Sequence, residues 1–152
     1  MKAEISIRLA RNYDARKIFN FLCELEEQLF DQQEFEVNYR LCLADNNNLY
    51  LVAVDKENIA IGYISCHGKI ILHHGGMVYE IQELFVEKSY RNKGIGKLLV
   101  QELEAYLIKR DYKSFEVATK KTRTGTRKFY ILSGFQETHV KFTKAKKGMS
   151  IM

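Results

Sequence analysis

A chain of 152 residues can bury about two-thirds of its unfolded surface, so we expect one domain spanning residues 1–152. Its formal net charge of +5, from 24 basic and 19 acidic residues, favours anionic ligands. Cys23, Cys42 and Cys66 stand singly, so neither a disulfide framework nor a zinc site is indicated. No apolar run has the length of a signal peptide or membrane span, and we expect a cytoplasmic protein without membrane attachment.

The N-terminal region predicts a strand followed by two helices. Apolar and polar residues alternate from Ala3 to Leu9, as they do in a strand. Asn12 can cap a first helix, and Phe35 to Leu43 has the pattern of a second, shorter one. The apolar stripe expected on the first helix comprises Ala15, Ile18, Leu22, Leu25 and Leu29.

Three strand-like runs then predict an antiparallel meander. Residues 55–58 and 73–76 are rich in turn-forming side chains and separate the runs. The expected strands are Leu49 to Val54, Ile59 to Leu72 and Met77 to Val86.

After the meander, the chain is expected to alternate between helices and strands. A helix begins beyond Val86 and continues to about Arg110, and Ser114 to Ala118 forms a strand. A further helix spans about Gly125 to Leu132, and Gly134 with Phe135 begins a last β segment.

The stretch between Val86 and Lys97 has the features of a phosphate-binding loop. Glycines at 94 and 96 let the backbone approach a ligand, while the first N–H groups of the following helix point at that ligand. An anion suits this position, and the surrounding basic residues favour a pyrophosphate over a single carboxylate. The spacing matches neither a Walker loop nor a dinucleotide-binding loop. The basic residues are Lys88, Arg91, Lys93 and Lys97.

Two motifs, in this order of elements, carry a resemblance to a known family. Arg91-Asn92-Lys93-Gly94-Ile95-Gly96 is similar to a Q/R-x-x-G-x-G/A loop, and the segment from Phe129 to Phe135 is similar to an F/L-Y-x-x-x-G-F motif. In both motifs and their spacing the chain resembles the GCN5-related N-acetyltransferase (GNAT) superfamily over nearly its whole length. It departs from many members in having Arg123 and Thr126 where they have asparagine and alanine.

The resemblance implies an α+β fold whose central mixed, mostly antiparallel sheet is splayed between strands 4 and 5 and flanked by about four helices. It also implies acetyl-CoA as cosubstrate, with no metal. The pyrophosphate would bind at the loop, the pantetheine arm would pair with the strand before it, and Lys97, Arg123 and Arg127 would meet the remaining phosphate. The expected cofactor-binding residues are Leu84, Phe85, Val86, Arg91, Asn92, Lys93, Gly94, Ile95, Gly96, Lys97, Arg123 and Arg127.

Acetyl transfer to an amine requires a base, because an alkyl amine with a pKa near 10.4 is protonated at neutral pH. Glu80 and Glu83 are the candidates, with Glu83 placed first and Glu80 kept as the alternative. Alternation along a strand should place them on opposite faces unless a bulge intervenes. A backbone N–H near Phe85 could stabilise the oxyanion. The family match implies that Tyr130 protonates the departing thiolate.

The acceptor amine stays open between a small molecule and a protein. Acidic residues around the first two helices favour a cationic acceptor, although a solvated helix face would look the same. Two other functions are considered: a non-catalytic CoA-binding module, and a toxin-like aminoacyl-tRNA acetyltransferase. Nucleic acid is not favoured, because no nucleic-acid-binding motif is found, and a homodimer is left open. The acidic residues are Glu24, Glu26, Glu27, Asp31, Glu34 and Glu36, and the histidines set aside as metal ligands are His67, His73, His74 and His139.

Overall fold

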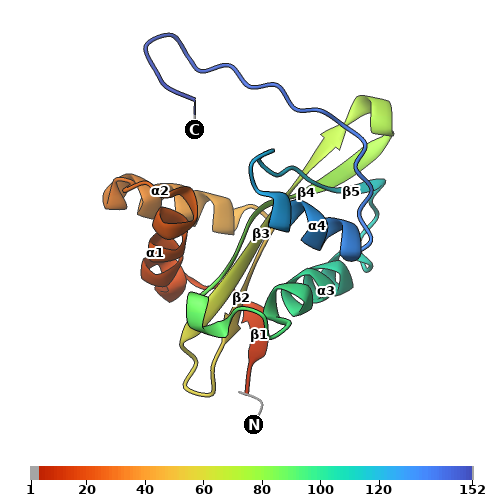
Figure 1. Cartoon of the computed structure of the whole chain (residues 1–152). Coiled ribbons are helices and arrows are strands. Elements are labelled where there is room, and N and C mark those ends of the chain that lie inside the picture. The colour runs from red at the N-terminus through yellow and green to blue at the C-terminus, as the bar shows by residue number, and fades with distance from the viewer. Residues whose placement is uncertain (1–3, 152) are drawn as a thin grey trace. The chain divides into compact units, whose positions relative to one another are not determined.

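The computed structural model describes residues 4–151. The chain forms two compact units, Met1–Val117 and Ala118–Met152. The first unit holds a five-stranded sheet in which spatial order follows chain order (Figure 1). The first four strands pair antiparallel and the fifth is parallel to the fourth, which confirms the expected mixed, mostly antiparallel sheet. The strands are β1 (Ser6–Leu9), β2 (Asn48–Val54), β3 (Ala60–Ile71), β4 (Gly76–Val86) and β5 (Ser114–Val117).

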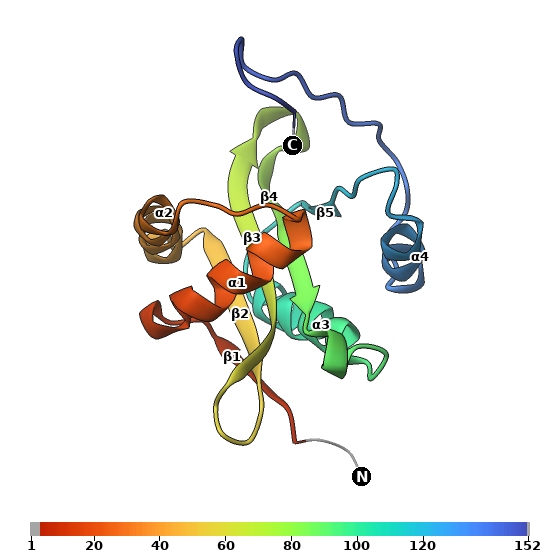
Figure 2. The same cartoon turned by 60° about the vertical axis from the view of Figure 1, so that its left-hand side comes forward.

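Two helices, α1 (Ala15–Glu26) and α2 (Gln32–Ala44), cover one face of this sheet (Figure 2). The start and end of α1 differ from expectation. Asn12 opens a short 3-10 turn (η1, Asn12–Asp14) instead of capping α1. Glu27 adopts a left-handed conformation with φ of 51°, which ends the helix, so Leu29 lies beyond it and is 86% exposed. Leu29 therefore does not belong to the apolar stripe.

An ion pair with a buried carboxylate joins β1 to the start of α1. Both terminal nitrogens of Arg8 donate to the Asp14 carboxylate, at 2.8 and 2.9 Å, and the backbone N–H of Arg11 donates to it at 2.7 Å. Asp14 is only 4% exposed, so these donors replace the water that its charge would otherwise need. The hydrogen bond and charge of Asp14 raise the pKa of Arg8.

A row of aromatic rings fills the space between the N-terminal helices and the sheet. Ring centroids are 5.3 Å apart for Phe19 and Phe35, and 5.7 Å apart for Phe35 and Tyr39. The row continues to Tyr50 on β2 and Tyr63 on β3, with centroid separations of 6.1 Å at both steps. Because large rings bury much apolar area, this row anchors both helices to the face that carries the candidate site.

The opposite face of the sheet packs against α3 (Ile95–Leu107), which lies on the other side from α1 (Figure 2). Leu99, Leu103 and Leu107 recur at helical spacing and are fully buried, as are Leu51 and Ile64 of the sheet. The helix ends at Leu107, slightly before the expected Arg110.

The second unit contains α4 (Thr124–Leu132), close to its expected span. The β segment expected from Gly134 onward is wrong, because residues 133–151 contain no strand. Gly134 takes a φ of 98° and ends the helix, and most of the later side chains, including Phe142, are exposed. A strand needs a paired neighbour and a buried face, and the pattern of this segment supplies neither by itself.

Candidate functional site

The loop before α3 has the conformation of an anion-binding helix start. Gly94 lies at the cap position with φ of 81°, a left-handed conformation that L side chains adopt at a cost, and Asn92 is left-handed as well, with φ of 62°. Gly94 O accepts the first helical hydrogen bond from the N–H of Leu98 at 3.0 Å. The N–H groups of the first turn, including that of Gly96, have no acceptor within a helix of this geometry. A Cβ at Gly94 would meet nothing within 4 Å, so the space beside this residue is open.

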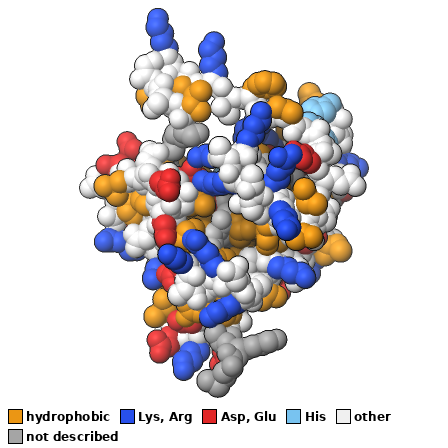
Figure 3. Space-filling model, in the orientation of Figure 1, with side chains coloured by type: hydrophobic (Ala, Val, Ile, Leu, Met, Phe, Trp, Pro, Cys, Tyr) orange, Lys and Arg blue, Asp and Glu red, His pale blue; other side chains and the backbone are white. Residues whose placement is uncertain are grey.

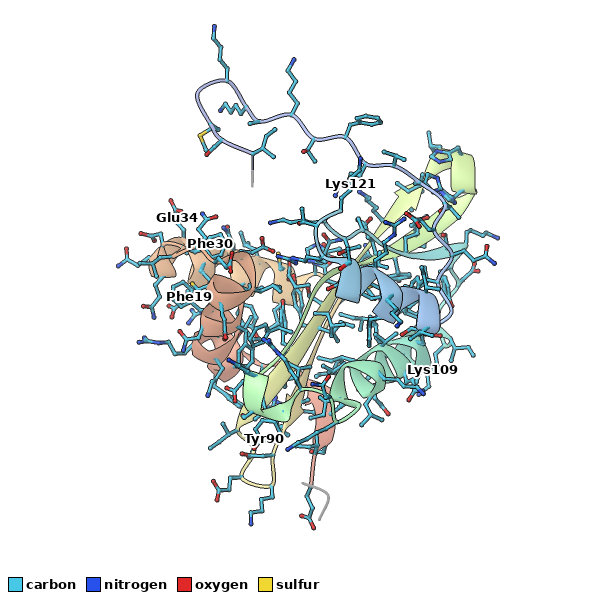
Figure 4. The ribbon with its side chains drawn as sticks, in the orientation of Figure 1. Phe19, Phe30, Glu34, Tyr90, Lys109 and Lys121 are labelled. Atoms are coloured by element: carbon cyan, nitrogen blue, oxygen red, sulfur yellow. The ribbon has the colours of Figure 1, made fainter. Side chains whose placement is uncertain are left out.

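Two of the basic residues of the loop, Arg91 and Lys93, contact neighbouring side chains or backbone. Nε of Arg91 donates to the carbonyl oxygen of Val86 at 2.8 Å, and its guanidinium lies 5.4 Å from the ring centroid of Phe85. Lys93 lies over Tyr90, which Figure 4 labels in the turn after β4 (η3, Lys88–Tyr90). Arg91 therefore ties the loop to the end of β4 and occupies one carbonyl of the segment expected to pair with a pantetheine arm. Lys88 and Lys97 are exposed.

The pairing of β4 with β5 ends part of the way along β4. It runs from Val78 opposite Ser114 to Ile81 opposite Val117, and β4 then continues to Val86. This termination agrees with the expected splay between strands 4 and 5. The segment from Leu84 to Val86, expected to contact the cosubstrate through its backbone, lies in the part of β4 beyond that pairing.

A β-bulge at Gln82 brings Glu80 and Glu83 to the same face of the sheet. Glu83 pairs with Ser65 and Ile81 pairs with Cys66, so Gln82 is an extra residue without an opposite partner in β3. The bulge reverses the alternation beyond it. Glu80 and Glu83 therefore both lie on the face covered by α1 and α2, which the sequence allowed only if a bulge intervened.

Glu83 is held by two hydroxyl groups of β3. Its Oε1 accepts hydrogen bonds from Ser65 Oγ at 2.5 Å and from Tyr63 Oη at 3.0 Å, and its backbone N–H donates to Ser65 Oγ at 3.1 Å. Burial, followed by the charge of Glu83, raises the pKa of Tyr63 well above its usual value, so this phenol remains a donor. The Glu83 carboxylate is thus fixed in position.

Glu80 lines a pocket with a volume of about 510 Å³ between the end of α2, the start of β2, β3 and β4. His67 faces it from β3, directly opposite Glu80 in the strand register, and forms a short hydrogen bond to the Tyr50 hydroxyl through Nε2. Gly68 is needed here, because a Cβ would clash with the ring of Tyr79. The lining residues are Leu41, Cys42, Asp45, Asn48, His67, Gly68, Lys69, Glu80 and Gln82.

The acidic residues that the sequence singled out on α1 and α2 do not line this pocket. They lie on the two helices and in the connection between them, exposed or partly exposed, and Glu34 lies on α2 away from the sheet (Figure 4); Figure 3 shows acidic side chains in this part of the surface. The carboxylates that do line the pocket are those of Asp45 and Glu80.

In the second unit, Tyr130 is buried within α4 at 6% exposure. Its ring makes edge-to-face contacts with Phe129 and Phe135, at centroid distances of 5.2 and 5.6 Å. Burial raises the pKa of Tyr130 to about 12, so the phenol keeps its proton at any physiological pH. Arg127 is paired with Glu137, the shortest N–O distance being 2.6 Å, while Arg123 occupies the cap position of α4.

Sequence reasoning missed the polar row on β3. Tyr63, Ser65 and His67 alternate with apolar residues, and the first two hold Glu83 while the third lines the pocket. The signal was present as three polar side chains at alternate positions of an otherwise apolar strand. Their partners, Tyr50 and Glu83, come from neighbouring strands and become apparent only once the register is known.

Within residues 4–151, no group of three or more His, Cys, Asp or Glu side chains is arranged to hold a metal ion. Over the same residues, no helix combines the length and apolar composition needed to cross a bilayer.

Comparisons with known proteins agree on a single family. Residues 13–135 match the acetyltransferase (GNAT) family model. The chain is 31% identical over 139 residues to the aminoalkylphosphonate N-acetyltransferase of Salmonella typhimurium, covering 91% of this chain and 90% of that protein.

Two solved structures show the same fold at low sequence identity. A transcriptional regulator from Bacillus halodurans superimposes with a TM-score of 0.85 at 20% identity, covering 94% of this chain and 100% of that one. An aminoglycoside N-acetyltransferase in complex with CoA gives a TM-score of 0.84 at 17% identity, covering 97% of each chain.

Proposed function

Because the chain belongs to the acetyltransferase (GNAT) family, we propose that it transfers the acetyl group of acetyl-CoA to the primary amine of a small molecule. The observation that carries this proposal is that Glu80, which the bulge at Gln82 places on the same face of β4 as Glu83, lines the pocket. The Salmonella relative, whose substrates are aminoalkylphosphonates by name, supports a small acceptor.

The residues at the start of α3 suit the pyrophosphate of the cosubstrate. The unbonded N–H groups of the first turn and the open space before Gly94 provide a backbone cradle, and Lys88, Lys93 and Lys97 add positive charge around it. The backbone from Leu84 to Val86 is proposed to accompany the pantetheine arm. Arg91 orients the loop through Val86 instead of meeting the phosphates alone.

Glu80 is proposed as the base that removes the amine proton, directly or through water. It lines the pocket, whereas Oε1 of Glu83 is already engaged by Ser65 and Tyr63. This reverses the preference that the sequence alone gave to Glu83. Glu83 is then a positioning residue that fixes the end of β4, and it remains the alternative base.

Two further roles complete the proposed reaction. A backbone N–H near Phe85 would stabilise the negative charge on the carbonyl oxygen during attack. Tyr130 would return a proton to the thiolate that leaves. Its raised pKa of about 12 keeps it protonated, so it can act as an acid but not as a base near neutral pH.

An amine panel tests the proposed function. The protein is incubated with acetyl-CoA and a set of aminoalkylphosphonates, diamines, amino acids and aminoglycosides, with free thiol as the readout. We expect thiol release that depends on at least one small amine. Coenzyme binding without turnover on any amine would instead identify a non-catalytic CoA-binding module, and acetylation confined to aminoacyl-tRNA would identify the toxin-like activity.

Paired variants test the assignment of the base. Glu80→Gln should lower turnover by about 10² to 10⁴-fold at neutral pH, and the defect should shrink as the pH approaches the pKa of the free amine. Glu83→Gln, whose amide oxygen can still accept from Ser65 and Tyr63, should cost less. The opposite ranking, with Glu80→Gln close to the parent protein, would move the base to Glu83.

A further inference from the structure

The pocket beside Glu80 carries side chains of opposite charge whose positions follow from the strand register. His67 on β3 lies opposite Glu80 on β4, and Lys69 lies opposite Val78. Residues 67 and 69 share a face, and Lys69 stands diagonally across from Glu80, at a Cα separation of about 7–8 Å. His67, Lys69 and Glu80 all line the same pocket.

Glu80 and Lys69 remain available to a ligand in different ways. Lys69 has no ion-pair partner among the residues that the structure describes. Among the hydrogen bonds of residues 4–151, the Glu80 carboxylate accepts one, a long bond of 3.3 Å from the exposed side chain of Gln82. Asp45, the other carboxylate of the pocket, already accepts from the N–H of Asn47 at 2.9 Å. An acceptor that carried only an amine would leave the ammonium group of Lys69 facing another cation.

The hydrogen bond between Tyr50 and His67 determines what the imidazole can offer to a ligand. Burial, followed by the Cys42 thiol and the charge of Glu83, raises the pKa of Tyr50 far above its usual value, so the phenol keeps its proton. Sulfur accepts only weakly, so Nε2 of His67 is the stronger acceptor for that proton. A neutral imidazole that accepts at Nε2 carries its own proton on Nδ1. Nδ1 has no hydrogen-bond partner within residues 4–151, so its N–H is free to donate to a ligand of the pocket that His67 lines.

We propose that the acceptor of this enzyme bears an anionic group as well as its amine, and that Lys69 and the Nδ1–H of His67 bind the anion while Glu80 faces the amine. The inference rests on the proposed function and adds the substrate class. A short ω-amino phosphonate or carboxylate would match the diagonal spacing of the two charges. The name of the Salmonella relative independently points to acceptors of this type. Tyr50 is a positioning residue, because it acts only by fixing the proton of His67.

Three acceptors of similar length, which differ in the charge of the group opposite the amine, test whether the pocket selects for an anion. Turnover is measured with 2-aminoethylphosphonate, 1,2-diaminoethane and propylamine, in the parent protein and in Lys69→Met. We expect the phosphonate to have the lowest KM. Lys69→Met should raise its KM about tenfold or more with little change in kcat, as expected from loss of a charge-assisted hydrogen bond. Propylamine should be unaffected. Lys56→Met, an exposed lysine in the turn between β2 and β3, serves as the control.

A spectroscopic measurement tests the role of Tyr50. ¹⁵N NMR of the parent protein should show His67 as the Nδ1–H tautomer, and Tyr50→Phe should lose this preference and raise the KM for the phosphonate but not for propylamine. A preference for the diamine, an equal effect of Lys69→Met on all three amines, or an Nε2–H tautomer in the parent would each overturn the inference.

The same design distinguishes this inference from the proposed function. If no amine is acetylated, the proposed function fails, and calorimetry still decides whether 2-aminoethylphosphonate binds and whether Lys69→Met abolishes that binding. If propylamine or the diamine is acetylated efficiently and the phosphonate is not, the enzyme is an amine acetyltransferase whose pocket does not select for an anion.

Discussion

Substitution of Gly94 by alanine should have two separate effects: it should lower the stability of the fold and weaken the binding of CoA. With φ at 81°, an L residue here costs about 1–2 kcal/mol. For a chain of this size that cost lowers the melting temperature by about 2–8 °C. The new Cβ also enters open space at the cap position of α3, and the pyrophosphate is proposed to bind at the N–H groups of this helix start. Loss of one charge-assisted hydrogen bond there, worth about 1.5–3 kcal/mol, weakens CoA binding by about 10- to 150-fold.

Gly75→Ala is a matched control, because Gly75 has a similar φ of 75° and its Cβ would also meet nothing within 4 Å. It lies in the turn between β3 and β4, away from the loop. Calorimetric titration with CoA and thermal melting are carried out on both variants. We expect similar losses of melting temperature, with the loss of affinity confined to Gly94→Ala. Unchanged affinity in a folded Gly94→Ala protein, or an equal loss in both variants, would refute the assignment of the loop.

Two further predictions concern chemistry and stability. Tyr130→Phe should lower kcat by about 10² to 10⁴-fold while CoA affinity stays unchanged, and kcat within twofold of the parent from neutral to alkaline pH would make Tyr130 a packing residue. Asp14→Asn should lower the free energy of unfolding by about 2 kcal/mol in urea titrations, because it removes the charge of a buried carboxylate that accepts from Arg8 and Arg11. Lys17→Met, which breaks the exposed pair with Glu87, should cost less than about 1 kcal/mol, and equal costs would contradict the burial argument.

Local patterns were sufficient to predict the loop and most elements of the fold. A left-handed Gly94 at the start of α3 follows from glycine and helix periodicity within a few residues, and the bounds of α4 follow in the same way. The end of α1 was misjudged because Glu27 takes a left-handed conformation that no residue preference predicts. Leu29 continued the apolar period but lies outside the helix.

The arrangement of the candidate site depends on pairing between strands, which the sequence does not specify. The bulge at Gln82 arises from the register of β4 against β3, and it alone decides that Glu80 and Glu83 share a face. For the same reason, His67 looked like an isolated histidine until the register placed it beside Tyr50 and Glu80. The sequence was enough to name Glu80 and Glu83 as candidate bases, but only the pairing of the strands shows that Glu80 lines the pocket.

The central claim is that this protein moves an acetyl group from acetyl-CoA to an amine. Its most direct test measures thiol release by absorbance and N-acetyl product by mass spectrometry in the same reaction. The first acceptor tried is 2-aminoethylphosphonate, followed by the other amines of the panel. We expect one free thiol for each acetylated amine, with both signals falling together in Glu80→Gln. Thiol release without any acetylated product, at a rate unaffected by the amine, would show hydrolysis instead of transfer and contradict the central claim.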